Sequence, residues 1–186
     1  MRVTPTSLPE VLLLEPKLFE DERGYFFESF NNRVFEQTIG RPVQFVQDNC
    51  SRSVRQVLRG LHYQVRQSQA KLVRVTSGAV FDVAVDLRRG SPTFGQWTGF
   101  VLSADDRRAV WIPEGFGHGF LALTDLADVA YKATDYYAPQ HERTVLWNDP
   151  DIGVAWPSSD GLIISAKDRA GTPLRDAELF DFSVTT

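Results

Sequence analysis

Hydrophobic and polar residues alternate along many short segments of the chain. In 79–88, apolar residues occupy every second position from Phe81 to Leu87, whereas Asp82 and Asp86 fall between them. Because side chains of an extended strand point alternately to its two faces, this spacing predicts a strand with one apolar face. Similar runs occupy 57–64, 71–77, 96–103, 108–113, 118–124 and 128–137. Turn-forming Gly and Pro residues separate several of these runs, so we expect a structure built mainly of short strands.

The segment 31–40 is the one that predicts a helix. An asparagine can cap its start, Phe35 and Ile39 lie one helical turn apart, and Gly40 follows directly, where glycine commonly ends helices. Many closely spaced strands with one short helix are typical of an antiparallel jelly-roll sandwich or barrel. We therefore expect a mainly all-β fold of jelly-roll type.

The chain shows the organisation of a single domain. It has no internal repeat, low-complexity tract or flexible linker, and its 186 residues suit one domain, since domains commonly hold roughly 100–200 residues. The segment from about 147 to 186 is irregular and rich in Pro, Asp and Gly. We expect one domain over 1–186, with this tail wrapped around the barrel.

Composition and charge exclude several classes of protein. A net charge of −4 disfavours nucleic acid as the main partner, because binding to phosphate backbones needs clustered Lys and Arg. Cys50 is the single cysteine, so it allows neither an intramolecular disulfide nor a Cys-based zinc site. The apolar run 11–14 is far shorter than a membrane span. We expect a cytoplasmic protein that does not bind membranes.

Histidine spacing raises the question of a metal. Pro113-x-Gly115-x-x-His118 resembles half of the metal motif of cupins, which are jelly-roll barrels. The second position of the usual His-x-His pair is Gln64 here, and no glutamate lies between 43 and 113. At most two ligands remain, whereas catalytic zinc normally has three protein ligands. We therefore predict no metal site.

Several polar side chains fall on apolar strand faces. Lys71 shares a face with Val73 and Val75, Tyr131 has apolar neighbours two positions away on either side, and His118 aligns with similar neighbours. Each has a structural interpretation, because a lysine can extend to water and a buried Tyr or His can simply be a hydrogen-bonded core residue. Convergence of several such groups inside a barrel favours a binding site.

The segment "SAKDR" (165–169) also has two interpretations. As a solvated loop, its charges simply pair with one another. Alternatively, Asp168 folds back and holds a histidine base in one tautomer, as carboxylates commonly do.

The whole chain resembles the dTDP-4-dehydrorhamnose 3,5-epimerase family, whose fold is a cupin-like jelly roll. The matching segments, in order, are "LEPKLFEDERGYFFESF" (14–30), "FVQDN" (45–49), "VLRGLHYQ" (57–64), "KLVRV" (71–75), "DVAVDLRRGSPTFGQW" (82–97), "WIPEGFGHGF" (111–120), "YKATDYY" (131–137), "WNDPDIGVAWP" (147–157) and "SAKD" (165–168). Two positions depart from the family pattern. The family usually has alanine at the position of Gly117 and often has histidine at the position of Cys50.

The resemblance implies the roles of particular residues. His62 is the base, paired with Asp168. Tyr131 is the acid, and Lys71 lies near the keto oxygen of the sugar. The implied substrate contacts are Arg23, Glu28, Gln47, Asn49, Arg59, His118, Glu142 and Lys167.

The implied reaction is cofactor-independent epimerisation at carbons 3 and 5 of dTDP-4-dehydro-6-deoxy-D-glucose. Both carbons flank the ketone at carbon 4, so inversion needs a base, a group that stabilises the enolate, and an acid on the opposite face of the ring. Three alternatives remain open: a mono-epimerase acting at carbon 3 or 5 only, a non-catalytic barrel that binds sugar nucleotides, and a metal-dependent cupin enzyme.

Two further expectations concern phosphate binding and assembly. The chain has no glycine-rich phosphate loop, so arginine forks from Arg23 and Arg59 are the implied phosphate ligands. Strict alternation places Arg59 and His62 on opposite faces, unless a bulge at Gly60 turns one of them inward. The resemblance implies a homodimer in which the N-terminal strands, about 1–30, are exchanged, so that Arg23 and Glu28 complete the neighbour's site.

Overall fold

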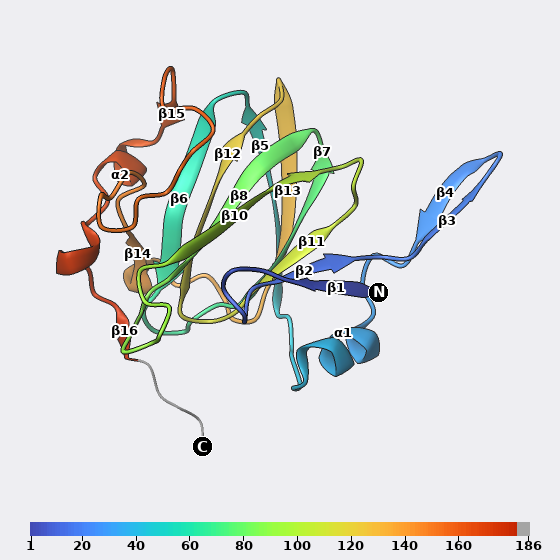
Figure 1. Cartoon of the computed structure of the whole chain (residues 1–186), viewed down its shortest axis with the longest axis horizontal. Coiled ribbons are helices and arrows are strands. Elements are labelled where there is room, and N and C mark those ends of the chain that lie inside the picture. Colours follow the sequence, from blue (N-terminus) through green and yellow to red (C-terminus); the bar gives the residue numbers. More distant parts are fainter. Residues whose placement is uncertain (182–186) are drawn as a thin grey trace.

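The computed structural model describes residues 1–181, which form two β-sheets packed face to face (Figure 1). Across the first sheet the strands are β1 (Arg2–Pro5), β2 (Leu12–Glu15), β11 (Ala109–Ile112), β7 (Lys71–Ser77), β13 (Leu126–Ala133) and β5 (Gln47–Val54). Across the second they are β10 (Trp97–Ser103), β8 (Ala79–Asp86), β12 (Phe116–Ala122), β6 (Val57–Gln64) and β14 (Glu142–Thr144), with β15 (Ile163–Ile164) beside β6. The predicted mainly all-β, antiparallel jelly-roll fold is confirmed.

The core lies between the inner faces of the two sheets. Val73 and Val75 of the first sheet pack in one cluster with Val80 and Ala84 of the second. Burial of such side chains contributes about 1.5–3 kcal/mol each. The two sheets are therefore held together along the faces from which the candidate polar side chains also project.

Strand β8 differs from the simple one-sided strand that its pattern predicts. Phe81, Val83 and Val85 lie on its outer face, where they pack against the C-terminal tail, whereas Val80 and Ala84 face the core. Asp82 shares the inner face with them and is fully buried. The apolar face of β8 is thus turned away from the space between the sheets, and its aspartates point inward.

The predicted helix is present as α1 (Asn32–Ile39). The side chain of Asn31 caps it by accepting a hydrogen bond from the backbone of Val34, and Gly40 ends it with a left-handed φ of 79°. Phe35 anchors α1 against Trp111 of β11, with ring centroids 5.2 Å apart. Within residues 1–181, no helix is long and apolar enough to cross a membrane.

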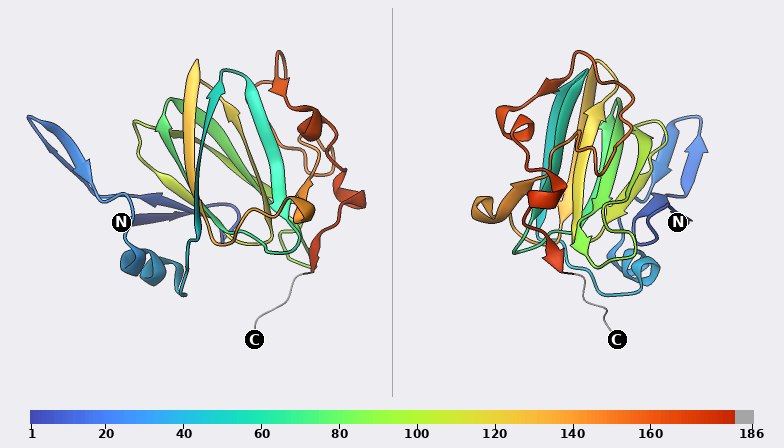
Figure 2. Two further views of the ribbon diagram at one scale, coloured as in Figure 1. Left: turned by 180° about the vertical axis from the view of Figure 1, so that it is seen from behind. Right: turned by 60° about the vertical axis from the view of Figure 1, so that its left-hand side comes forward.

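The C-terminal segment runs along the outer face of the second sheet (Figure 2). It contains β15, α2 (Ala166–Arg169), the 3₁₀ turn η2 (Leu174–Asp176) and β16 (Phe180–Asp181), which pairs with the short strand β9 (Arg88–Arg89). Ile152, Leu174 and Ala177 bury their side chains against the outward residues of β6 and β8. Residues 182–186 of the expected wrapping tail lie outside the described residues.

A hairpin of β3 (Leu18–Asp21) and β4 (Gly24–Phe27) projects from the opposite side of the molecule (Figures 1 and 2). Its aromatic residues Phe19, Tyr25 and Phe26 are exposed. A two-stranded hairpin is marginally stable on its own, and within one chain this one leaves its three aromatic rings exposed to solvent.

A bulge interrupts the pairing of β6 with β12. His62 pairs with His118 and Arg59 pairs with Phe120, so two residues of β6, Gly60 and Leu61, face the single residue between His118 and Phe120. Gly60 has a φ of 116°, and its peptide bond to Leu61 is cis. The bulge brings Arg59 and His62 to the same inner face, which resolves the conflict that strict alternation creates.

We expect Gly60→Ala to lower the free energy of unfolding by about 3 kcal/mol, through backbone strain and overpacking. A methyl group there would lie 2.6 Å from the Cα of Gly119 and 2.7 Å from the carbonyl oxygen of His118. Gly161→Ala is the matched control, because Gly161 also has a positive φ, 67°, but no neighbour within 4 Å. The control should lose about 1 kcal/mol. Urea unfolding followed by tryptophan fluorescence measures both, and equal losses would contradict the close-approach argument.

Candidate active site

His62 and Asp168 form a hydrogen-bonded pair between β6 and the C-terminal tail. The imidazole Nε2 lies 2.6 Å from Oδ1 of Asp168. The backbone N–H of Gly60 donates to the other carboxylate oxygen at 3.3 Å. Burial opposes ionisation of Asp168, but its hydrogen bond to His62, the charge of that ring and the hydrogen bonds to Gly60 and Ser165 together outweigh burial and lower its pKa. An ionised Asp168 holds the proton on Nε2, which leaves the lone pair of Nδ1 available as a base.

The short helix α2 presents this carboxylate. The hydroxyl of Ser165 caps α2 by accepting a hydrogen bond from the backbone N–H of Asp168 at 3.1 Å. Pairing of β15 with β6 fixes the segment that enters the helix. The "SAKDR" segment is therefore an ordered helix with a buried Asp168, and the interpretation as a solvated loop is wrong.

Lys71 and Tyr131 belong to the first sheet, and the charge of Glu142, which also interacts with His62, acts on both. The ammonium Nζ of Lys71 lies 5.8 Å from the centroid of the Tyr131 ring. Burial lowers the pKa of Lys71 to about 8, and the charges of Asp82 and Glu142 oppose that shift. Burial raises the pKa of Tyr131, and Glu142 adds to the increase. Tyr131 therefore holds its proton near neutral pH, and Lys71 loses its charge only as pH rises through about 8.

A second histidine–aspartate pair lies on the second sheet beside the first. His118 Nε2 is 2.9 Å from Oδ2 of Asp82, and both side chains are buried. Sequence reasoning placed His118 on an apolar face but did not assign Asp82 to the site. An aspartate inside an otherwise apolar strand was the signal, because carboxylates are rarely buried without a partner.

Glu142 is the centre of a small network at the edge strand β14. It pairs with Lys167 at 2.5 Å and accepts a hydrogen bond from the Tyr137 hydroxyl at 2.8 Å. Burial raises the pKa of Glu142, but these two hydrogen bonds and the positive charges nearby, Lys167 first and then His62, more than offset it and lower that pKa. Tyr137 was not singled out, although it ends the quoted motif "YKATDYY".

Gln47, Asn49 and Arg59 line the same region from β5 and β6. Gln47 donates to the Asn49 side chain at 2.8 Å and accepts from the backbone N–H of Tyr137 at 2.9 Å. Asn49 is the cross-strand partner of Tyr131. Arg59 donates through Nε to the hydroxyl of Ser53 at 3.0 Å, and its charge acts on Tyr131. These residues therefore gather around the candidate acid.

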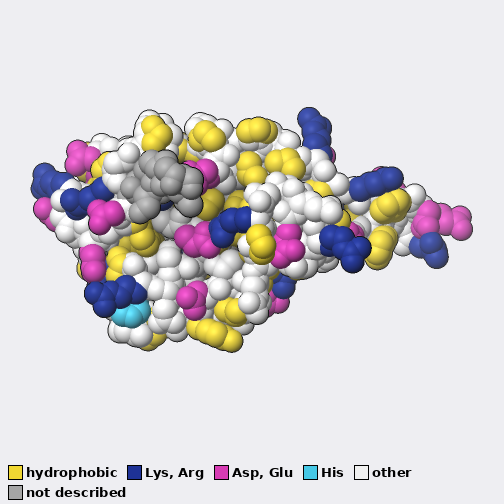
Figure 3. All heavy atoms as spheres, turned by 90° about the horizontal axis from the view of Figure 1, so that it is seen from below, with side chains coloured by type: hydrophobic (Ala, Val, Ile, Leu, Met, Phe, Trp, Pro, Cys, Tyr) yellow, Lys and Arg dark blue, Asp and Glu magenta, His cyan; other side chains and the backbone are white. Residues whose placement is uncertain are grey.

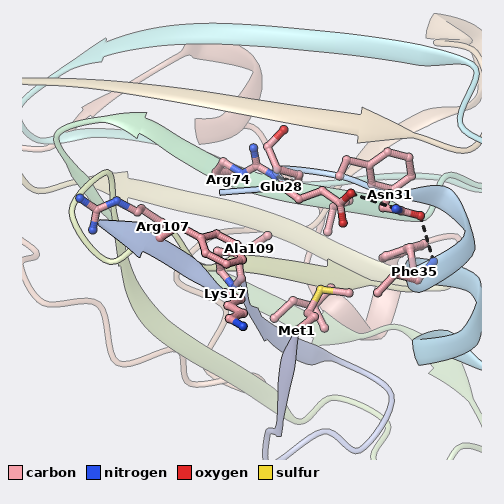
Figure 4. Close-up of a pocket in the computed structure, with 15 residues that line it drawn as sticks. Met1, Lys17, Glu28, Asn31, Phe35, Arg74, Arg107 and Ala109 are labelled. Atoms are coloured by element: carbon pink, nitrogen blue, oxygen red, sulfur yellow. Dashed lines mark hydrogen bonds between the residues drawn. The ribbon is translucent and has the colours of Figure 1, made fainter. Parts of the chain in front are cut away.

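Arg23 and Glu28 are the two predicted residues that lie elsewhere. Arg23 is at the tip of the projecting hairpin, where its exposed side chain pairs with Asp21 at 2.5 Å. Glu28 lines a pocket of about 250 Å³ on the outer face of the first sheet. Figure 4 shows the side chain of Asn31 hydrogen-bonded to Glu28 there, with Phe35 at one end of the pocket and Arg107 at the other. Within one chain, neither residue reaches the group around His62.

The position that would complete a cupin metal motif has another role. The Gln64 amide donates to the backbone carbonyls of Gln67 and Tyr136 and accepts from the N–H of Ala138. Its hydrogen bonds thus tie β6 to the segment that precedes β14. Across residues 1–181, no group of three His, Cys, Asp or Glu side chains is placed to hold a metal ion.

Comparison with known proteins places this arrangement in a family. The family model described as dTDP-4-dehydrorhamnose 3,5-epimerase matches residues 5–176. The chain is 58% identical over 180 residues to a dTDP-4-dehydrorhamnose 3,5-epimerase from Pseudomonas aeruginosa, and the alignment covers 97% of this chain and 99% of that protein.

Solved structures agree with the sequence match. The structure of dTDP-6-deoxy-D-glucose-3,5-epimerase from Legionella pneumophila, in complex with dTDP-4-keto-L-rhamnose, is 48% identical, has a TM-score of 0.95 and overlaps 98% of both chains. A 3'-monoepimerase from Streptomyces bikiniensis, in complex with dTDP-quinovose, is 38% identical with a TM-score of 0.86 over 92% of this chain and 87% of the other. The chain with its two inward-facing His–Asp pairs therefore belongs to the dTDP-4-dehydrorhamnose 3,5-epimerase family.

Proposed function

We propose that this protein converts dTDP-4-dehydro-6-deoxy-D-glucose to dTDP-4-dehydro-L-rhamnose by epimerisation at carbons 3 and 5, without a cofactor. One observation carries the proposal: the base and the acid come from different sheets. His62 projects from β6 of the second sheet, and Tyr131 projects from β13 of the first. A ring held between the sheets has one group on each of its faces, as inversion requires.

The proposed chemistry moves only protons and one electron pair. Nδ1 of His62 takes the proton from the carbon next to the ketone, and the electrons of that C–H bond pass to the oxygen on carbon 4. The ammonium of Lys71 stabilises the resulting enolate, an electrostatic contribution that is large in a dry site. Tyr131 then donates its hydroxyl proton to the same carbon from the opposite face. Transfer of the His62 proton to the Tyr131 phenolate through solvent restores both groups.

The charged groups at one edge of the sandwich suit a nucleoside diphosphate. The guanidinium of Arg59 uses one N–H on Ser53 and one on the backbone carbonyl of Arg52. Its remaining N–H groups are available for phosphate oxygens, which match the planar fork of an arginine. Lys167 adds a second cation at this edge.

We also propose that the active protein is a homodimer in which the hairpin of one copy completes the site of the other. The projecting position of Arg23 and the exposed aromatic residues of the hairpin support this proposal. Figure 3 shows hydrophobic side chains along the projecting hairpin and charged side chains at its end. The apolar pocket beside α1 supplies a further surface that a second copy can cover.

We expect wild-type protein in D₂O to place deuterium at both carbons 3 and 5 of the keto sugar, as measured by NMR. His62→Ala should reduce the exchange rate by about a hundredfold to ten-thousandfold, the usual range for loss of a general base. His141→Ala is the control, because His141 lies outside the site on the 3₁₀ turn η1 (Pro139–His141). Label at one carbon only would identify a mono-epimerase, and binding without exchange would identify a non-catalytic barrel.

We expect kcat to fall as pH rises through about 8. The folded-state pKa of Lys71 is about 8, and its ammonium form is the one that stabilises the enolate, so activity is present below that pH and lost above it. In Lys71→Arg the guanidinium stays charged at every accessible pH, so this alkaline limb should disappear even if the maximal rate is lower. A limb that is unchanged in Lys71→Arg would assign it to another group.

We expect Arg23→Ala and His62→Ala to be inactive separately but to complement each other when mixed through unfolding and refolding. A mixed dimer with an exchanged hairpin has one site with both changes and one with neither. Equal mixing should therefore recover roughly a quarter of wild-type activity. Absence of recovery, with mixed dimers demonstrated by differential tags, would show that Arg23 acts within its own chain or not at all.

A further inference from the structure

Two buried aspartates on β8 have very different surroundings. Both oxygens of Asp86 are satisfied, by the guanidinium of Arg88 and by the hydroxyls of Ser91 and Thr93. Asp82 is equally buried, but only its Oδ2 has a partner, His118. Its Oδ1 has no hydrogen-bond partner within the described part of the chain.

This difference indicates that Asp82 does not serve stability alone. A buried carboxylate oxygen with no donor is destabilising, because it loses its hydrogen bonds to water and gains none in the protein. Asp86 shows that the same strand can hold a fully satisfied carboxylate where only structure is needed. The incompletely paired carboxylate of Asp82 on the inner face therefore indicates an electrostatic interaction with a group on the opposite sheet.

Lys71 is the group that this charge acts on. On its own sheet, Lys71 is paired with Ile112 of β11 and Ala133 of β13, which carry no charge, and its Nζ lies over the ring of Tyr131. Strand β10 of the second sheet, which packs against β7, has no ionisable residue. Across the sandwich the charged groups that act on it are Asp82 of β8 and Glu142 of β14.

Of these two carboxylates, Asp82 is the one still free to balance Lys71. Glu142 already pairs with Lys167 and accepts the hydroxyl of Tyr137. Asp82 has only a ring N–H of His118, which it accepts without requiring that ring to be charged. The same contact fixes the His118 ring, with Nε2 turned to Asp82 and Nδ1 turned away from it.

We propose that Asp82 is a positioning residue for the reaction: it orients His118 and keeps the ammonium of Lys71 charged, so that both are ready to stabilise the enolate. This inference rests on the proposed function for its meaning in catalysis, but the effect on Lys71 can be measured without substrate. Under this proposal, the His118–Asp82 pair helps to stabilise the negative charge on the oxygen of carbon 4, whereas the His62–Asp168 pair removes the proton.

Direct titration of Lys71 tests the inference without turnover. The chain has four lysines, Lys17, Lys71, Lys132 and Lys167, so NMR of protein labelled with ¹³C- and ¹⁵N-lysine gives few signals, and Lys71→Arg assigns the one of interest. We expect Asp82→Asn to lower the midpoint of the Lys71 titration by about one pH unit or more, since an opposite charge nearby shifts a pKa by that order. An unchanged midpoint would overturn the proposal.

Kinetics provide the second measurement. Asp82→Asn should lower kcat at pH 8 by about fivefold or more with little change in KM, and move the alkaline limb to lower pH, so that part of the rate returns near pH 6.5. Asp82→Ala also removes the acceptor for His118, so its kcat should be lower still. If wild-type protein has no turnover, the proposed function fails, and the lysine titration still decides the role of Asp82.

Asp86→Asn is the matched control for destabilisation. It removes a buried charge from the same strand, and we expect it to lower the thermal midpoint of unfolding at least as much as Asp82→Asn does. It should leave both the Lys71 titration and the alkaline limb unchanged. A shift of either in Asp86→Asn would show that loosening of β8, and not the charge of Asp82, controls Lys71.

Discussion

Several buried carboxylates of this protein connect neighbouring elements through a basic partner: Asp168 through His62, Asp86 through Arg88 and Asp82 through His118. Removing one member of a buried ion pair commonly costs about 3–5 kcal/mol, because it leaves the other charge uncompensated. Asp168 is the clearest case: its oxygens accept from His62 and from the backbone of Gly60, and the tail that carries it packs along β6. The position of the C-terminal segment is thus tied to the ionisation of one carboxylate.

Other proposed functional side chains also pair with a residue on a different strand or helix. Glu142 connects β14 to α2 through Lys167, and Asp82 connects β8 to β12 through His118. Arg59 connects β6 to β5 through Ser53. Glu142, Asp82 and Arg59 therefore each have a partner on a neighbouring element that restricts the side chain, as precise positioning of reacting groups requires.

Much of this arrangement could be predicted from the sequence, and the remainder depended on three-dimensional contacts. Alternation identified the strands, and it placed Lys71 and Tyr131 on inner faces, because that property is local to each strand. It failed at β8, where an outer layer of tail buries the apolar face and leaves Asp82 inside. The face of Arg59 followed only from the bulge, since register against β12 is not encoded in β6 alone. No local pattern could pair Asp168 with His62 across 106 positions.

A sandwich of two sheets suits an inversion that proceeds through a planar enolate. Packed sheets lie about 10 Å apart, so groups that project from facing strands approach a flat ring from opposite sides without any movement of the backbone. His62 and Tyr131 have this relation, and Lys71 lies next to Tyr131. Carbons 3 and 5 flank the same carbonyl, so one set of groups can serve both if the ring turns between the two events. On this argument, selectivity between one and two inversions resides in how the sugar is held, and not in a second base.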